Sequence, residues 1–176
     1  MWDLEGIPLD DPDLPRGCVP YLPCPVAAVL DAVDQAGVTS NDVFVDVGSG
    51  LGRAALLAHL KTGAGCIGLE IQHTLARTAQ GRADWVNLSR VRFLQGDAAE
   101  MVRFIPIGTV FFLYCPFGKT RIRHFLEGLE DVAYSRTIRV CCVDMPSLEA
   151  RWLAPMPSTS SRVDLYRSTF LTKPRK

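Results

Sequence analysis

The sequence predicts a single α/β domain built on a doubly wound, mostly parallel sheet. Five short apolar segments alternate with helical periodicity, their ends lie about 20 to 28 residues apart, and a glycine turn directly follows the first of them. That spacing suits strand–helix–strand crossovers. The chain has 176 residues, the size of one domain, and its hydrophobic fraction of 48% is ordinary for a globular protein.

The periodicity of the chain assigns its helices and strands in order. Residues 1–24 are rich in proline and acid and predict an irregular arm that precedes a domain over 25–176. From Pro25 an amphipathic helix runs to Gly37. The expected strands are 43–47, 66–70, 91–95, 109–115 and 138–143, the expected helices are 51–62, 72–88, 98–104 and 119–130, and the tail adds a short apolar piece near Trp152 and a strand near 162–171.

Charge and cysteine content argue against several classes of protein. Lys+Arg and Asp+Glu both number 19, so the net charge is zero and predicts no general attraction to nucleic acid or to an anionic membrane. Residues 1–17 are acidic and the last four residues include three basic ones, and we expect both ends to be solvated. No secretory signal or long apolar run is present. The six cysteines form no Cys-x-x-Cys pair, which argues against a metal site and favours a reduced, cytoplasmic setting.

The strongest local signal is the turn after the first predicted strand. The segment Val45-Asp-Val-Gly-Ser-Gly-Leu-Gly52 has glycines at three alternate positions, preceded by Asp46. Glycine lets the backbone reverse from strand to helix while it stays close to a ligand. The next strand ends in Glu70. Strand, glycine turn, helix, strand and acid form the layout that holds an adenosine-containing cofactor at a sheet edge.

Two other nucleotide-binding patterns fit this turn poorly. A nicotinamide or flavin site prefers Gly-x-Gly-x-x-Gly, whose third glycine would stand where this chain has Arg53. A dehydrogenase would also need a substrate domain, for which the chain leaves no room. A Walker-type phosphate loop is excluded because no Gly-Lys-Ser/Thr follows the turn. A nicotinamide-dependent oxidoreductase is therefore only a second alternative.

Polar residues gather at the ends of the predicted strands. Parallel strands joined by right-handed crossovers bring their carboxyl ends to one edge of the sheet, where sites in open α/β folds form. We therefore expect five segments to meet there, and the residues at their ends are Gly48, Glu70, Asp97, Cys115 and Asp144.

These residues resemble the class I S-adenosylmethionine-dependent methyltransferases. The resemblance rests on the glycine turn, Glu70, Gly96-Asp97-Ala98 and Leu113-Tyr-Cys-Pro-Phe-Gly118, and it covers about residues 20–145. The segment Tyr21-Leu-Pro-Cys-Pro25 is similar to small bacterial members, and the glycine turn to that of histone-lysine methyltransferases that lack a SET domain. The resemblance implies a Rossmann-like sheet of about seven strands in the order 3-2-1-4-5-7-6, with an antiparallel last strand and helices on both faces.

The resemblance also implies a cofactor, S-adenosylmethionine, which is released as S-adenosylhomocysteine. Asp46 and the glycine turn would hold its methionine moiety, and Glu70 would accept hydrogen bonds from the ribose hydroxyls. Asp97 would accept a hydrogen bond from the adenine amino group; it could also be an ordinary helix N-cap, and both roles can coexist. The full expected cofactor set is Tyr21, Asp46, Val47, Gly48, Ser49, Gly50, Gly52, Glu70, Ile71, Asp97, Ala98 and Cys115.

The resemblance places the methyl acceptor at Cys115, Pro116 and Phe117. Amine and amide methyltransferases often have Asn-Pro or Asp-Pro and an aromatic residue there, and Cys115 cannot supply the equivalent side-chain oxygen. No His or Lys neighbour in the sequence would lower the pKa of this thiol, which argues against a nucleophile. Asp144 and Tyr21 are candidate bases for an amine acceptor, which must be neutral to react.

Other ionisable residues have simpler interpretations. The histidines His59, His73 and His124 fall on predicted helices, and we interpret them as surface or satisfied side chains. The helix 119–130 has a basic face that favours solvation, with contact to an acidic acceptor surface as the alternative. That face consists of Lys119, Arg121, Arg123 and His124.

The leading functional expectation is methyl transfer to an unidentified acceptor, either a small molecule or a protein side chain, with nitrogen slightly favoured. Such a reaction depends mainly on alignment and on exclusion of water. The arm at 1–24 is the candidate lid and acceptor-recognition segment. Because the acceptor motif is altered at Cys115, a non-catalytic S-adenosylmethionine-binding module or complex subunit stays open as an alternative.

Overall fold

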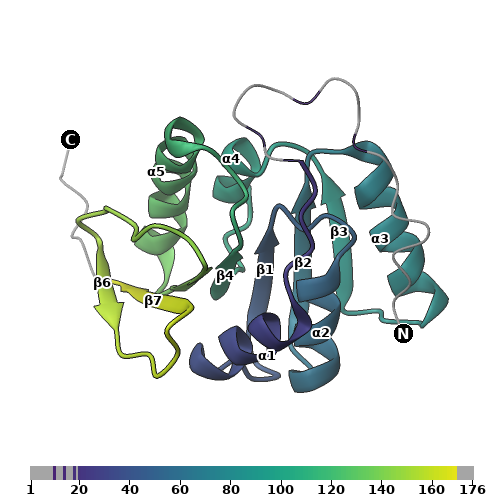
Figure 1. Ribbon diagram of the computed structural model, residues 1–176, viewed down its shortest axis with the longest axis horizontal. Helices are drawn as coiled ribbons and strands as arrows, with labels where there is room; N and C mark the ends of the chain where they lie inside the picture. Colours follow the sequence, from purple (N-terminus) through teal and green to yellow (C-terminus); the bar gives the residue numbers. More distant parts are fainter. Residues whose placement is uncertain (1–9, 11–13, 15–17, 19, 170–176) are drawn as a thin grey trace.

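A seven-stranded sheet forms the centre of the protein, in the order β3-β2-β1-β4-β5-β7-β6 (Figure 1). The computed structural model describes residues 10, 14, 18 and 20–169, so most of the acidic and basic ends lies outside the described residues. Strand β7 (Val163–Ser168) runs antiparallel to β5 (Arg139–Val143) and to β6 (Leu153–Met156). The predicted fold class, strand order and antiparallel last strand are confirmed.

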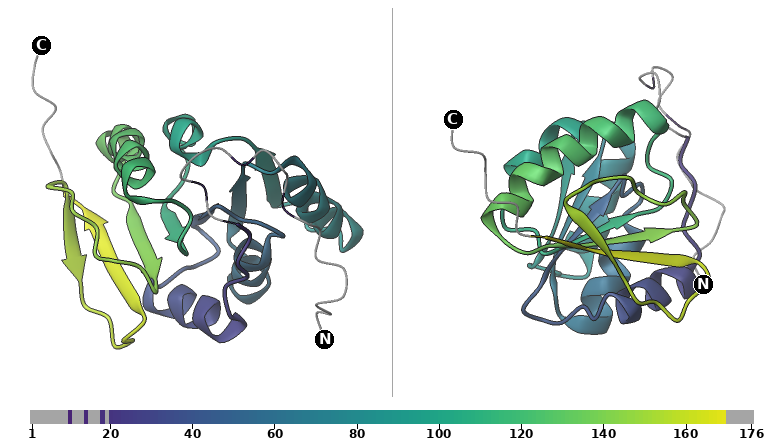
Figure 2. Two further views of the ribbon diagram at one scale, coloured as in Figure 1. Left: turned by 45° about the horizontal axis from the view of Figure 1, so that its top comes forward. Right: turned by 90° about the vertical axis from the view of Figure 1, so that its left-hand side faces the viewer.

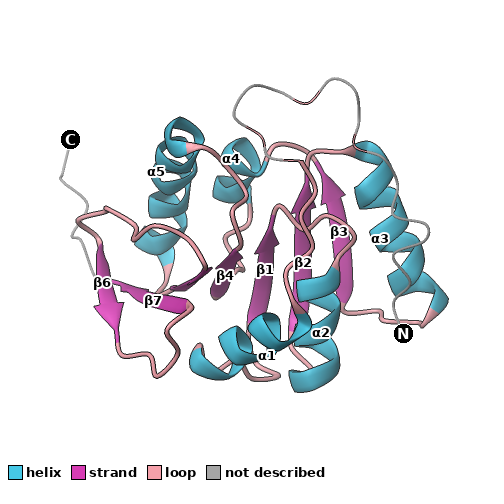
Figure 3. Ribbon diagram, viewed as in Figure 1, coloured by secondary structure: helices cyan, strands magenta, loops and turns pink. Residues whose placement is uncertain are grey.

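The parallel strands surround the segment that leads into the glycine turn. Strand β1 (Val43–Val47) pairs with β2 (Gly65–Glu70) on one side and with β4 (Val110–Leu113) on the other. Strand β3 (Val91–Gln95) pairs with β2 at the edge of the sheet. All of β4 and most of β1 are buried, as expected for strands covered on both faces. Figure 3 shows the strands as one twisted sheet between helices.

Helices cover both faces of the sheet, which the right-hand view of Figure 2 shows edge-on. Helices α1, α2 and α3 pack on one face, and their contacts with the sheet consist largely of alanine and valine. Helices α4 and α5 pack on the other face, α4 through Ala98 and Ala99 and α5 through larger apolar side chains such as Phe125 and Leu129. The bounds are α1 (Val26–Gln35), α2 (Arg53–Thr62), α3 (His73–Trp85), α4 (Ala98–Met101) with a 3-10 turn at Val102–Phe104, and α5 (Lys119–Ser135). No described helix has the length and apolar character needed to cross a membrane.

Element boundaries differ from the prediction where the backbone takes unusual dihedrals. Strand β4 ends at Leu113 rather than at residue 115, because Cys115 has a φ of 45° and Pro116 offers no N–H group. Helix α3 ends at Trp85 rather than at residue 88, before Asn87 with a φ of 55°. Helix α5 instead runs five residues further than expected, to Ser135.

Gly52 is the N-cap of α2 and fixes the path of the chain into that helix. Its φ is 79°, and a Cβ atom there would lie 2.4 Å from the ring of Phe93 and 3.1 Å from the Cβ atom of Ala79. A side chain at this position would therefore cause both backbone strain and a steric clash.

We predict that Gly52→Ala lowers the free energy of unfolding by at least about 2 kcal/mol, as measured by urea denaturation. Gly81→Ala is the matched control, since Gly81 lies inside α3 and a Cβ atom there would have no neighbour within 4 Å. The control is expected to gain about 0.5–1 kcal/mol. Equal stability of Gly52→Ala and the parent protein would show that Gly52 is not required for packing.

Candidate functional site

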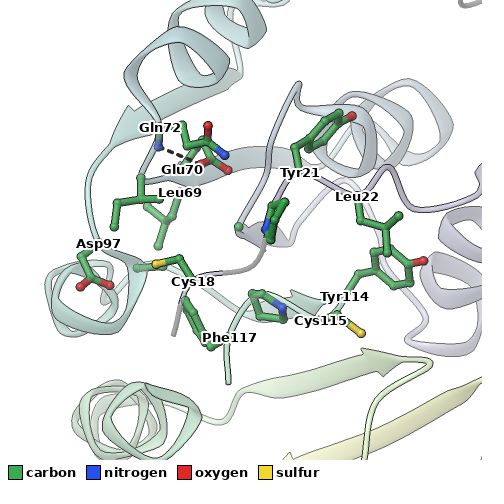
Figure 4. A pocket seen from close by; sticks show the side chains of 15 residues that line it. Cys18, Tyr21, Leu22, Leu69, Glu70, Gln72, Asp97, Tyr114, Cys115 and Phe117 are labelled. Carbon is green, nitrogen blue, oxygen red and sulfur yellow. Dashed lines mark hydrogen bonds between the residues drawn. The ribbon is translucent and has the colours of Figure 1, made fainter. Parts of the chain in front are cut away.

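Two adjoining cavities lie along the edge where the parallel strands end. The first is bordered by arm residues around Tyr21, the ends of β2 and β3 at Glu70 and Asp97, and the segment 114–117 (Figure 4). The second lies between arm residues 21–24 and the glycine turn. Both cavities are lined by Tyr21, Leu22, Gly48 and Tyr114. The structure thus brings together four of the five residues that the sequence placed on one edge, whereas Asp144 lines neither cavity.

Only the first glycine of the turn faces the cavities. Gly48 has a φ of 75° and lines both of them, whereas a Cβ atom on Gly50 would lie 2.1 Å from the ring of Tyr21. Gly52 packs under Phe93 instead. Of the other residues expected around the cofactor, Val47 and Ser49 line the second cavity, and Ile71, Ala98 and Cys115 line the first.

Glu70 points into the first cavity from the end of β2. One carboxylate oxygen accepts a hydrogen bond from Gly50 N at 2.7 Å, and the other from Gln72 N at 2.8 Å. Burial raises the pKa of this carboxyl group, and the two backbone donors partly oppose that effect. Because a carboxylate oxygen has two acceptor sites, each oxygen can still accept a ligand hydroxyl.

A buried acid and a cation line the second cavity. Asp46 is buried and accepts a hydrogen bond from Ala55 N at 3.1 Å. Burial raises its pKa to about 7. Arg53 lines the same cavity, and its Nη1 atom donates to the carbonyl of Cys24 at 3.0 Å. In the sequence Arg53 stands out only as a departure from the dinucleotide pattern, and its place in the cavity depends on the fold.

Asp97 borders the first cavity and caps α4. Its Oδ1 atom accepts a hydrogen bond from Ala99 N at 3.0 Å, which confirms the N-cap role. Its Oδ2 atom forms an ion pair with Arg121 of α5. The predicted basic face of α5 is therefore partly neutralised, and His124 likewise contacts Glu100 at 2.8 Å.

The residues expected to act on the acceptor, Cys115 and Asp144, make contacts that leave both of them poor bases. The thiol of Cys115 lies 3.5 Å from the carbonyl of Asp144, and burial raises its pKa. Arg162 hydrogen-bonds the Asp144 carboxylate and lowers its pKa, which makes Asp144 a weak base. Within this segment Tyr114 lines both cavities, whereas Cys115, the residue predicted to meet the acceptor, lines only the first.

The described part of the arm contacts the rim of the first cavity. Asp10 accepts hydrogen bonds from the backbone N–H of Tyr21 at 2.9 Å and from the side-chain amide of Gln72 at 2.8 Å. Cys18 forms an antiparallel bridge with Phe117. Asp10 was missed because the irregular arm offered no periodicity that could place it.

The histidines contact groups outside the two cavities. His59 Nδ1 lies 2.7 Å from the carbonyl of Ala64, and His73 Nδ1 lies 3.1 Å from the side-chain oxygen of Gln95. Within the described residues, no cluster of His, Cys, Asp and Glu side chains is arranged to hold a metal ion.

Comparison with known proteins points to one class of enzyme. Residues 24–105, slightly less than half of the chain, match the family model of the histone methylation protein DOT1. An RNA methyltransferase from Salinibacter ruber, solved with S-adenosyl-L-homocysteine, is 27% identical, with a TM-score of 0.66, and the match covers 88% of this chain and 97% of that one. None of the curated proteins matches the chain.

Two more distant solved structures share the fold. A putative methyltransferase from Escherichia coli is 18% identical, with a TM-score of 0.58, and the match covers 74% of this chain and 77% of that chain. A geranyl diphosphate methyltransferase solved with S-adenosylmethionine is 13% identical, with a TM-score of 0.62, and the match covers 83% of this chain and 85% of that chain.

We predict that Asp46 makes the stability of the protein depend on pH. Its pKa is about 7 in the folded state against an ordinary 3.8, so between about pH 4 and pH 7 the unfolded chain has released a proton that the folded chain keeps. Stability therefore falls as the pH rises through this window, by at most about 4 kcal/mol. Asp46→Asn should remove this contribution in urea titrations.

The exposed residue Asp164, changed to Asn, is the control for the Asp46 measurement. Below about pH 4 both states of the parent keep the proton, so the difference in stability between the parent and Asp46→Asn should change only above that pH. Parallel stability curves for the two proteins from acid to neutral pH would contradict the assignment.

Proposed function

We propose that this chain, whose fold and glycine motif are those of the class I S-adenosylmethionine-dependent methyltransferases, binds S-adenosylmethionine across the two cavities and transfers its methyl group to an acceptor. The observation that carries the proposal is the pair of cavities joined at Gly48, one containing Glu70 and the other Asp46 and Arg53. A nucleoside joined to an amino acid needs such a combination of groups. The neighbours solved with S-adenosylmethionine or S-adenosylhomocysteine support this cofactor.

The charges of the second cavity favour an amino acid over a dinucleotide. The α-amino acid end of S-adenosylmethionine has one cation and one anion, which match Asp46 and Arg53. A dinucleotide would instead bring a pyrophosphate to the turn, close to the buried carboxyl group of Asp46. Repulsion between these groups adds to the case against the oxidoreductase alternative.

Different residues of the site would bind different parts of the cofactor. Glu70 would accept the ribose hydroxyls, and Asp97 the adenine amino group. Asp46 and Arg53 would orient the methionine end, directing the activated methyl group on the cofactor sulfonium toward the space beside Tyr114. Chain residues thus contribute alignment and water exclusion rather than acid–base chemistry.

The side chains near Tyr114 bear on the nature of the acceptor. Asp144 is held ionised by Arg162, and burial keeps Cys115 as a thiol, so neither is a good base at neutral pH. A lysine ammonium, with a pKa of about 10.4, would need such a base. We therefore propose a nitrogen acceptor that is already neutral at pH 7.

The six free cysteines support a further proposal, that the protein works in a reduced cytoplasmic setting.

A transfer assay distinguishes the acceptor classes. The protein is incubated with S-adenosylmethionine labelled on its methyl group and with separate RNA, protein and small-molecule fractions of a cell lysate. The RNA fraction is included because a similar solved protein is an RNA methyltransferase. Label in one fraction, reduced with Glu70→Gln when S-adenosylmethionine is limiting, identifies the acceptor class. Tight binding of S-adenosylhomocysteine with no label in any fraction would favour the non-catalytic alternative.

We predict that Glu70→Gln weakens binding of S-adenosylhomocysteine by about 1–3 kcal/mol, because one charged acceptor for the ribose hydroxyls is lost. Isothermal titration calorimetry measures the change. Glu127→Gln, at an exposed position of α5, is the matched control and should bind like the parent. Unchanged affinity in Glu70→Gln would remove Glu70 from the binding site.

Arg53→Gln should weaken binding of S-adenosylhomocysteine about 10- to 150-fold, as expected for a lost hydrogen bond to a charged group. Binding of 5′-methylthioadenosine, which lacks the amino acid end, should stay unchanged. The comparison of these two ligands on one variant is its own control for folding. An equal loss for both ligands would mean that Arg53 acts through the glycine turn and not on the carboxylate.

A further inference from the structure

Asp97 is held by two different donors at the wall of the first cavity. Its Oδ1 atom accepts the hydrogen bond from Ala99 N at the start of α4, and its Oδ2 atom pairs with Arg121 of α5. Figure 4 shows Asp97 and Phe117 at the same end of this cavity. Both oxygens of this carboxylate at the cavity wall are therefore fixed in position.

Arg121 touches two walls of the cavity without lining it. The carbon at the centre of its guanidinium group lies 6.0 Å from the centroid of the Phe117 ring, within the range of a cation–π contact. Phe117 in turn packs on Phe125 of α5, with ring centroids 5.7 Å apart. One side chain from α5 thus holds both Asp97 and Phe117.

The Asp97–Arg121 ion pair contributes little to the stability of the fold. The two side chains are only 28% and 19% exposed, and pairs of this kind gain little net free energy because both charges lose water. The Nε atom of Arg121 is buried without a hydrogen-bond partner among the described residues, which adds a cost. The cap of α4 needs only Oδ1. The arrangement therefore calls for another explanation.

We propose that Arg121 is a positioning residue that makes this cavity specific for a 6-aminopurine. The inference rests on the proposed function, in which Asp97 meets the adenine ring. The guanidinium group contacts Oδ2 while Ala99 N donates to Oδ1, so the two contacts together fix the orientation of the Asp97 carboxylate at the cavity wall. An ionised carboxylate only accepts hydrogen bonds. It therefore binds the amino group of adenine and repels the oxo group that hypoxanthine has at the same position.

Calorimetry with two ligands tests this inference. The parent protein should bind S-adenosylhomocysteine about 10- to 150-fold more tightly than S-inosylhomocysteine, the 6-oxo analogue, since one hydrogen bond to a charged group separates them. Arg121→Gln should reduce this ratio at least about fivefold, and Arg121→Lys, which keeps the charge, should retain more of it. Asp97→Asn should bind the 6-oxo analogue better than the parent does, because an amide can donate.

The outcomes separate this inference from the proposed function. Arg123→Gln, at an exposed position of the same helix, should keep the parent ratio. An unchanged ratio in Arg121→Gln, or a parent protein that binds both ligands equally, would overturn the role of Arg121 while cofactor binding stands. A parent protein that binds neither ligand would contradict the proposed function and this inference together. Thermal unfolding of each variant shows that the comparison is made between folded proteins.

Discussion

The contact between the Glu70 carboxylate and the backbone of the glycine turn organises this edge of the sheet. Gly50 N donates to Glu70, and the N–H groups of Gly48 and Ser49 both donate to the carbonyl of Leu69. The turn after β1 is thus tied to the end of β2 by the Glu70 side chain and by the Leu69 carbonyl. Both cavities border this tied segment, and α2 starts directly after it. The position of the site therefore depends on a few hydrogen bonds between neighbouring strands.

Local patterns in the sequence were enough to predict the fold and the first part of the site. Alternating apolar segments predicted the α/β fold class, the resemblance to the class I methyltransferases implied the strand order, and the glycine turn together with Glu70 and Asp97 predicted which edge forms the cavities. These features are local because a strand end, a turn or a helix cap is set by residues close together in the chain. Right-handed crossovers then place the carboxyl ends of the parallel strands at one edge of the sheet.

The residues that sequence analysis missed depend on contacts between distant segments. Arg53 meets the carbonyl of Cys24, 29 residues away, and Asp10 meets Gln72, 62 residues away. The sequence placed Arg121 on a solvated basic face, whereas the packing of α5 brings it into an ion pair with Asp97. Tyr114 was overlooked because the left-handed backbone at Cys115 turns that thiol toward β5. None of these contacts has a signature in sequence spacing.

The buried acids beside the glycine turn also make the stability of the folded chain depend on its ligand. Asp46 and Glu70 interact unfavourably with each other, and burial opposes the ionisation of both. A ligand with positive charge between them offsets this repulsion, and a ligand that binds only the folded chain raises the folded fraction by mass action. Proteases act on transiently open chains. Bound methyl donor should therefore protect the folded chain from proteolysis.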